Sequence, residues 1–173
     1  RSGEAARKLT EAFRDKTARK VYWALVVGVP RPDQGKIDAA LGKEALSGGE
    51  LMAVTPDGKR AVSYYKVMEP FGKRAAWVAF LPITGRTHQL RVHALTMGHP
   101  IVGDGKYGGK EAFLEGRVSK KLHLHARSIE IPHPAGGSLS VTAPLTSHMK
   151  DSWKMFGLDP NDESDPFEDL EPD

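Results

Sequence analysis

Short apolar segments separated by turn residues dominate the pattern of this chain, and most of them are typical of strands. Residues 20–28 are rich in valine and aromatic side chains and precede a loop that contains prolines and a glycine, so they predict a strand. Residues 36–41 predict another short strand. Turn residues between paired segments predict two hairpins: residues 60–69 with 74–81 across Gly72-Lys73, and residues 122–131 with 139–143 across residues 134–137.

Three segments follow a helical spacing instead. Residues 2–17 predict a helix that Ser2 can cap. Residues 86–97 place their apolar side chains on one helical face and end before Gly98, where a C-cap glycine is expected. Residues 146–156 predict a closing helix. Antiparallel hairpins with helices at both ends indicate an α+β domain rather than a βαβ repeat.

The length of 173 residues, with 39% hydrophobic and 27% charged residues, is that of one globular domain. The sequence contains no cysteine, which excludes a disulfide framework, a thiolate zinc site, an iron–sulfur cluster and a cysteine nucleophile. The longest apolar run, residues 22–27, is far shorter than the roughly 18 residues that a membrane span needs, and no signal peptide precedes it. We therefore expect a soluble, cytoplasmic protein.

Charge is divided unevenly along the chain. The formal net charge is +3, but residues 159–173 hold eight acids and no base, so residues 1–158 carry 25 bases against 14 acids, or +11. A folded body with this excess attracts polyanions such as nucleic acid, although a basic surface can also serve solubility alone. The acidic segment has few apolar residues, so we expect residues 1–158 to fold and residues 159–173 to form a mobile tail.

The densest group of candidate functional residues lies in residues 85–93, Gly-Arg-Thr-His-Gln-Leu-Arg-Val-His. Arg86, Gln89 and His93 fall at three- and four-residue intervals, so one helix face can present a cation, an amide and an imidazole, while Arg91 projects elsewhere. The same spacing fits a half-buried helix whose polar side chains bind local carbonyl groups. The spacing by itself leaves both interpretations open.

Other familiar sites are poorly supported. The seven histidines include no H-E-x-x-H or comparable ligand set, so we expect no metal site. Residues 47–49, Ser-Gly-Gly, lack the context of a nucleophile elbow, and residues 103–109 lack the spacing of a P-loop. Aromatic side chains beside lysines could stack on bases or pack the core; they are Tyr22, Trp23, Tyr64, Tyr65 and Tyr107.

A longer pattern resembles a known family. Residues 20–25 (KVYWAL), 61–67 (AVSYYKV) and 81–93 (LPITGRTHQLRVH), continued by residues 98–104 (GHPIVGD), resemble the RluA-type RNA pseudouridine synthases in order and spacing. Residues 122–126, 133–134 and 143–145 resemble the closing strands of the same catalytic domain. The resemblance covers about residues 1–153.

This resemblance implies the isomerisation of uridine to pseudouridine in ribosomal or transfer RNA, without a cofactor or metal. It implies a mixed, mostly antiparallel sheet with peripheral helices and an RNA-binding cleft. Arg91 matches the arginine that pairs with the catalytic aspartate, Tyr22 the tyrosine that lies against the target base, and Leu90 the apolar residue of the base pocket. We assign the neighbouring motif residues Arg86, His88 and Gln89 to substrate binding.

The sequence departs from the family at its nucleophile. The family's aspartate lies in a motif close to H-R-L-D-x-x-T-S-G, and no such string occurs in the 173 residues. Residues 1–5 are similar to the helix that follows this motif, so we expect the nucleophile upstream of the chain and expect the chain alone to be inactive. Asp104 lies in a Gly-Asp-Gly turn and is interpreted as structural. The alternative function is a catalytically silent RNA-binding module.

Overall fold

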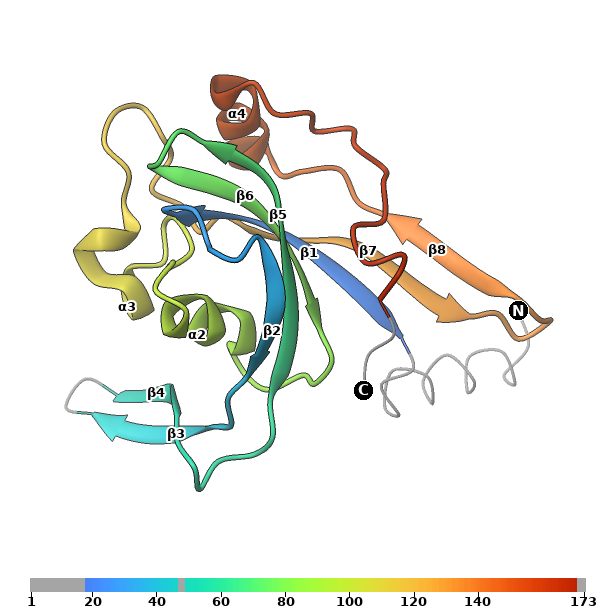
Figure 1. Cartoon of the computed structure of the whole chain (residues 1–173), viewed down its shortest axis with the longest axis horizontal. Helices are drawn as coiled ribbons and strands as arrows, with labels where there is room; N and C mark the ends of the chain where they lie inside the picture. The colour runs from blue at the N-terminus through green and yellow to red at the C-terminus, as the bar shows by residue number, and fades with distance from the viewer. Residues whose placement is uncertain (1–17, 47–48, 171–173) are drawn as a thin grey trace.

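The computed structural model describes residues 18–46 and 49–170. Its main sheet has six strands in the order β2-β5-β6-β1-β7-β8, all paired antiparallel, and two further strands form a separate hairpin (Figure 1). The helix predicted for residues 2–17 lies outside the described residues. The strands are β1 (Arg19–Val27), β2 (Gln34–Asp38), β3 (Leu41–Leu46), β4 (Gly49–Val54), β5 (Val62–Phe71), β6 (Ala75–Pro82), β7 (Leu124–Pro132) and β8 (Ser138–Thr142).

The described helices are short and peripheral, which confirms the predicted α+β class. They are α2 (Gln89–Thr96), α3 (Gly105–Gly108), the 3-10 helix η1 (Gly109–Ala112) and α4 (Ser147–Phe156). α2 begins three residues later than predicted because His88 has a left-handed backbone with φ 54°, which interrupts the helical geometry. Among the described residues, no helix is both long and apolar enough to cross a membrane.

The strand predicted for residues 36–41 is divided in the structure. β2 ends at Asp38, and β3 begins at the buried Leu41, which exchanges backbone hydrogen bonds of 2.9 and 2.8 Å with Lys59. The chain thereby leaves the main sheet and forms the β3–β4 hairpin. This hairpin was not predicted because its residues are largely Gly, Ala, Lys and Glu, which are depleted in strands.

The two faces of the sheet carry different apolar clusters, because neighbouring side chains of a strand point to opposite faces. On one face, the ring of Trp23 lies 4.7 Å from Trp77 and 6.1 Å from Trp153 of α4, measured between centroids. α2 packs on the other face against residues that include Phe80. Tyr22 precedes Trp23 and lies with the α2 cluster, so it is directed to the face opposite α4.

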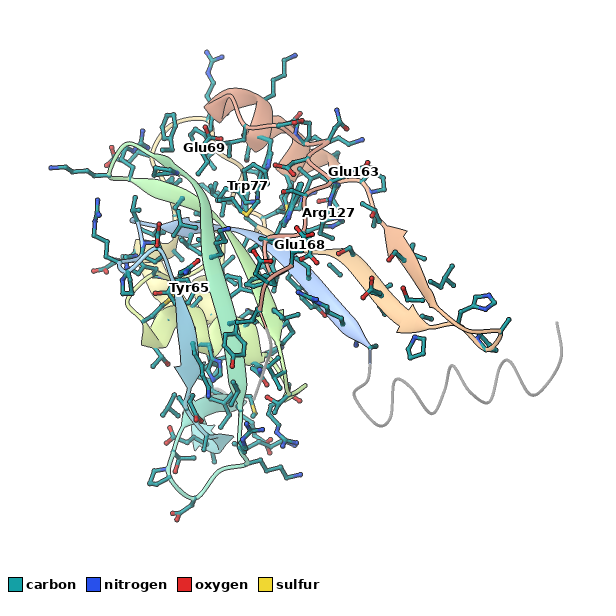
Figure 2. All side chains as sticks on the ribbon, turned by 45° about the vertical axis from the view of Figure 1, so that its right-hand side comes forward. Tyr65, Glu69, Trp77, Arg127, Glu163 and Glu168 are labelled. Atoms are coloured by element: carbon teal, nitrogen blue, oxygen red, sulfur yellow. The ribbon has the colours of Figure 1, made fainter. Side chains whose placement is uncertain are left out.

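The acidic segment, which the structure describes as far as residue 170, contacts the folded body. Phe167 is 4% exposed and packs in the tryptophan cluster. Arg19 donates a hydrogen bond to the Phe167 carbonyl, and Arg127 donates one of 3.1 Å to the Asp162 carbonyl. Figure 2 shows Glu163 of this segment close to Arg127. A single buried phenylalanine and two arginines thus fix a segment whose average composition suggested disorder.

Candidate functional site

A cavity of about 470 Å³ lies between the beginning of β1, the end of β6 and the beginning of α2. All of the residues that the sequence predicted for the site line this cavity. They are Tyr22 from β1, Arg86 and His88 from the segment that joins β6 to α2, and Gln89, Leu90 and Arg91 from the first turn of α2. The structure therefore brings together residues from two regions that are more than sixty positions apart in the sequence.

The cavity combines basic and apolar side chains. Arg86, Arg91 and Lys20 supply its positive charge, and none of the described residues that line it is acidic. Tyr22 and Leu90 supply apolar surface. Lys20 was not predicted, although its position two residues before Tyr22 places both side chains on the same face of β1. This lining fits a ligand that has a flat ring and a negatively charged group next to the ring.

Gln89 holds the entrance to α2 in place through its side-chain amide. Its Oε1 accepts hydrogen bonds from the Thr84 hydroxyl at 2.6 Å and from the Arg86 backbone N–H at 3.1 Å. Its Nε2 donates to the Val62 carbonyl at 3.0 Å and to the Ser63 hydroxyl at 2.9 Å. Because protein groups satisfy both ends of this buried amide, Gln89 holds the loop before α2 in place.

His93 belongs to the same internal network and not to the cavity. Its Nδ1 lies 2.9 Å from the Ser63 hydroxyl, and its Nε2 lies 3.0 Å from the Ala39 carbonyl. Burial lowers the pKa of His93, so the imidazole is neutral near pH 7. For Gln89 and His93, the interpretation as a half-buried helix with satisfied polar side chains is therefore confirmed.

Arg86 and Arg91 point in different directions, as the sequence predicted. Arg86 donates from Nε to the Arg60 carbonyl at 2.8 Å in an exposed contact. Arg91 forms a two-point ion pair with Asp104, through Nε to Oδ2 at 2.9 Å and through Nη2 to Oδ1 at 2.7 Å. The hydrogen bond to Asp104 raises the pKa of the Arg91 guanidinium, which therefore stays charged. Asp104 is 1% exposed and does not line the cavity, so it is not placed to react with a ligand there.

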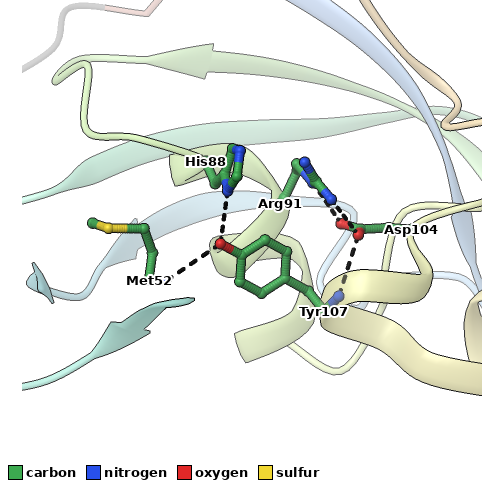
Figure 3. A network of polar contacts seen from close by, with 5 residues as sticks. All are labelled: Met52, His88, Arg91, Asp104 and Tyr107. Atoms are coloured by element: carbon green, nitrogen blue, oxygen red, sulfur yellow. Dashed lines mark hydrogen bonds and ion pairs between the residues drawn. The ribbon is translucent and has the colours of Figure 1, made fainter. Parts of the chain in front are cut away.

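His88 is connected to the rest of the site through Tyr107 (Figure 3). Its Nδ1 lies 2.7 Å from the Tyr107 hydroxyl, which accepts a hydrogen bond of 3.3 Å from the Met52 backbone N–H in β4. Burial, followed by the charges of Arg91 and Lys106, lowers the pKa of His88. A neutral His88 that accepts at Nδ1 carries its hydrogen on Nε2, so it can donate a hydrogen bond to a ligand.

Trp23, Tyr65 and His123 have structural roles. Trp23 is 1% exposed in the core, and the Tyr65 hydroxyl donates to the Pro32 carbonyl at 2.8 Å. His123 is fully buried, with Nε2 2.7 Å from the Ser152 hydroxyl. In the part of the chain that the structure describes, no three His, Asp or Glu side chains gather as metal ligands would.

The sequence interpretation missed the connections behind the cavity wall. Asp104 was expected to be structural, but its pairing with Arg91 was not predicted, and Tyr107 was considered only as a core or base-stacking residue. In the sequence, the feature that could have pointed to these connections was the glycine-rich turn after residues 86–97. Such a turn does not reveal which side chain its aspartate will meet, because the contact spans 13 residues of sequence.

Sequence comparisons place the chain among enzymes that modify RNA. Residues 1–96 match the family model described as RNA pseudouridylate synthase. Ribosomal large subunit pseudouridine synthase C of Vibrio cholerae is 38% identical over 149 residues, which cover 84% of this chain and 46% of the relative. Dual-specificity RNA pseudouridine synthase RluA of Escherichia coli is 40% identical over 141 residues, which cover 81% and 63%. An uncharacterized RNA pseudouridine synthase of Zymomonas mobilis is 39% identical over 153 residues, which cover 87% and 68%.

Structural comparison extends the similarity over more of the chain. Human RNA Pseudouridylate Synthase Domain Containing 4 has a TM-score of 0.70 and 28% identity, covering 92% of this chain and 70% of that chain. Human RNA Pseudouridylate Synthase Domain Containing 1 has a TM-score of 0.68 and 26% identity, covering 94% and 75%. The chain spans about half the length of several curated relatives that it matches.

Proposed function

The chain belongs to the RluA-type family of RNA pseudouridine synthases, and we propose that it forms the base-binding side of a site that converts uridine in structured RNA to pseudouridine. The convergence of Tyr22, Leu90 and Arg91 on one basic cavity carries this proposal. A nucleotide that leaves its stack needs a flat apolar surface for its base and positive charge for its phosphates. Tyr22 and Leu90 offer the surface, and Lys20 and Arg86 offer the charge.

The reaction rearranges bonds within one nucleotide. The glycosidic bond between N1 and C1′ breaks, and the base is reattached through a bond between C5 and C1′. N1 gains a proton and C5 loses one, so atoms and electrons balance without a cofactor. The site therefore has to hold the base, turn it and move a proton. Tyr22 lies against the base in this proposal and limits how it can turn.

Arg91 orients the nucleophile. In this proposal the nucleophile is an aspartate of an H-R-L-D motif, which the 173 residues do not contain. Arg91 lines the cavity, and its guanidinium has donors that Asp104 does not use. A carboxylate in a water-poor cleft needs such donors to stay ionised and oriented. The absence of acids among the described lining residues fits a carboxylate that comes from another segment.

The RNA partner is ribosomal RNA in the first place and transfer RNA in the second. The relatives include one named as a ribosomal large subunit synthase and one named as dual-specificity. The +11 charge of residues 1–158 supplies the long-range attraction that any structured RNA would experience.

A catalytically silent RNA-binding module is the second candidate. The observation that favours it is the same lack of acidic side chains among the described residues that line the cavity. Such a module would bind a flipped or single-stranded nucleotide at Tyr22 and Leu90 without breaking a bond.

Tritium release from RNA that contains 5-tritiated uridine distinguishes the two functions. We expect the 173-residue chain to bind ribosomal RNA transcripts without releasing tritium. A protein in which the natural upstream segment with its H-R-L-D motif precedes this chain should release it. If that longer protein binds RNA and releases no tritium from ribosomal or transfer RNA, the silent module is the correct function.

A further inference from the structure

We propose that Asp104 is a positioning residue for this site, because it orients Arg91 directly and His88 through Tyr107. The inference rests on the proposed function and adds to it a buried group that touches neither substrate nor nucleophile. Asp104 does not line the cavity; it lies between Ile101, which forms an isolated β-bridge with Val26, and the helix α3, which it caps. Figure 3 shows its contacts with Arg91 and Tyr107. Both of its carboxylate oxygens accept hydrogen bonds from Arg91, and Oδ1 also accepts one from the Tyr107 backbone N–H.

The first connection is to Arg91. Asp104 occupies the side of the guanidinium that carries Nε and one hydrogen of Nη2. Three hydrogens remain: one of Nη1 and the other of Nη2 lie together along the adjacent end-on edge of the planar group, and the second hydrogen of Nη1 points toward the Cδ side. Since Arg91 lines the cavity and Asp104 does not, this remaining edge is the one that can meet a second carboxylate.

Two contacts restrict rotation of this arginine. The fork fixes the plane of the guanidinium, and its central carbon lies 5.0 Å from the centroid of the Tyr107 ring. Asp104 also compensates the positive charge of Arg91. A second carboxylate would therefore be held mainly by directed hydrogen bonds to the remaining edge and less by net charge. The orientation that Asp104 gives to Arg91 therefore determines the position of that second carboxylate.

The second connection leads to His88. Asp104 Oδ1 accepts a hydrogen bond of 3.2 Å from the Tyr107 backbone N–H and thereby caps α3. This places the Tyr107 hydroxyl 2.7 Å from His88 Nδ1. Nε2 of His88 has no hydrogen-bond partner among the described residues, and His88 lines the cavity. In this proposal the Tyr107 hydroxyl donates to Nδ1 and thereby selects the tautomer that presents an Nε2–H donor to an acceptor oxygen of the RNA.

The test uses three variants and one control. Asp104→Asn keeps the size of the side chain and removes the second acceptor oxygen and the charge. Asp104→Glu keeps both oxygens. Tyr107→Phe keeps the ring and removes the hydroxyl, which contacts both His88 and the Met52 backbone N–H. Asp151→Asn is the control, because Asp151 is exposed on α4, on the opposite side of the sheet.

The first measurement is nitrogen NMR on the 173-residue chain, and it does not depend on activity. In the parent chain we expect a slowly exchanging Nε–H signal for Arg91 and a His88 imidazole protonated at Nε2. Asp104→Asn should abolish the slow exchange, and Tyr107→Phe should leave His88 as a mixture of tautomers. If Arg91 and His88 keep their parent signals in these variants, the proposal is overturned, whether or not the chain takes part in catalysis.

The second measurement is single-turnover tritium release by the protein that includes the H-R-L-D motif. Asp104→Asn should slow release by roughly 10- to 100-fold, by analogy with the loss of hydrogen-bond partners that orient metal ligands. RNA affinity should stay within about twofold, since Asp104 does not contact RNA in this account. Asp104→Glu should restore part of the rate, and Asp151→Asn should leave it unchanged.

The outcomes of the two proposals are separable. An inactive parent protein contradicts the proposed function, while the NMR measurement still decides whether Asp104 positions Arg91 and His88. An active parent whose rate is unchanged by Asp104→Asn contradicts the positioning role alone. If circular dichroism shows that the Asp104→Asn variant is unfolded, Asp104→Glu and Tyr107→Phe are measured in its place. Altered rates of these two variants at unchanged RNA affinity support the positioning role, and unchanged rates contradict it.

Discussion

At the scale of single residues, the histidines His88, His93 and His123 have different roles. His88 lines the cavity, whereas His93 and His123 are fully buried and hydrogen-bonded to Ser63 and Ser152. Burial lowers the pKa of each of these three imidazoles. The difference matters because a neutral buried histidine contributes to stability only while it stays neutral.

Stability should therefore decrease on mild acidification. The folded-state pKa values of His93 and His123 lie below that of an unfolded histidine, about 6.5, so the unfolded chain binds protons more readily. The free energy of unfolding is then fully retained above that value and falls as the pH drops below it toward the folded pKa. Thermal unfolding between about pH 7.5 and pH 5.5 measures this loss.

The control for this prediction is a pair of substitutions. His123→Gln should weaken the pH dependence of the melting temperature, although the variant itself is less stable. His133→Gln, in the turn between β7 and β8, should leave the pH dependence as it is. Identical pH dependence in both variants would show that buried histidines do not cause it.

At the scale of elements, a few side chains hold the polar segment after α4 in place. Leu158 and Phe167 are the buried apolar residues of this segment, at 6% and 4% exposure. Arg19 and Arg127 bind its backbone carbonyls. The segment therefore covers the tryptophan cluster on the face opposite the cavity.

Truncation of this anchor should destabilise the whole domain. Phe167→Ala removes a buried aromatic ring and should lower the free energy of unfolding by about 3–5 kcal/mol. Phe113→Ala is the matched control, because that ring is 38% exposed, and it should cost much less. Urea unfolding of both variants tests this, and equal losses would contradict a packed C-terminal segment.

The sequence predicted most elements of the main sheet but not those that depend on distant partners. β5, β6, β7 and α4 follow from apolar segments and turn residues, because local pattern and tertiary environment agree there. The β3–β4 hairpin is held by Leu41, and by the Tyr107 hydroxyl that contacts Met52. Likewise the family resemblance identified Arg91, whereas Asp104 and Tyr107 required coordinates, since no local pattern encodes a contact across the fold.

At the scale of the whole molecule, the charges are arranged on two sides of the sheet. Arg86, Arg91 and Lys20 lie at the cavity, and the acidic segment packs on the face that carries α4. RNA approaching this molecule should therefore be directed to the cavity face and repelled from the other.

RNA binding should weaken steeply with salt, with a log–log slope of several units, because phosphate contacts release counterions. Neutralising the exposed acids through Glu163→Gln, Glu168→Gln and Asp169→Asn should tighten binding slightly while Phe167 keeps the segment packed. Filter binding between low and moderate salt measures both effects. Affinity that stays flat with salt, or that ignores the three substitutions, would contradict this electrostatic account.

We propose that uridine is isomerised in the cavity around Arg91, and a comparison of two arginine variants tests this proposal. Single-turnover tritium release is measured for Arg91→Lys and Arg86→Lys in a protein in which a segment with an H-R-L-D motif precedes this chain. Lysine keeps the charge but lacks the planar fork that Arg91 uses with Asp104. Because lysine cannot offer a carboxylate nucleophile the same aligned donors, Arg91→Lys should release tritium at least 100-fold more slowly at nearly unchanged RNA affinity, which corresponds to about 3 kcal/mol in activation free energy. Arg86→Lys should lose far less, because Arg86 contacts a backbone carbonyl at the surface.

Parent-like turnover by Arg91→Lys, together with loss of the reaction in Arg86→Lys, would contradict the account.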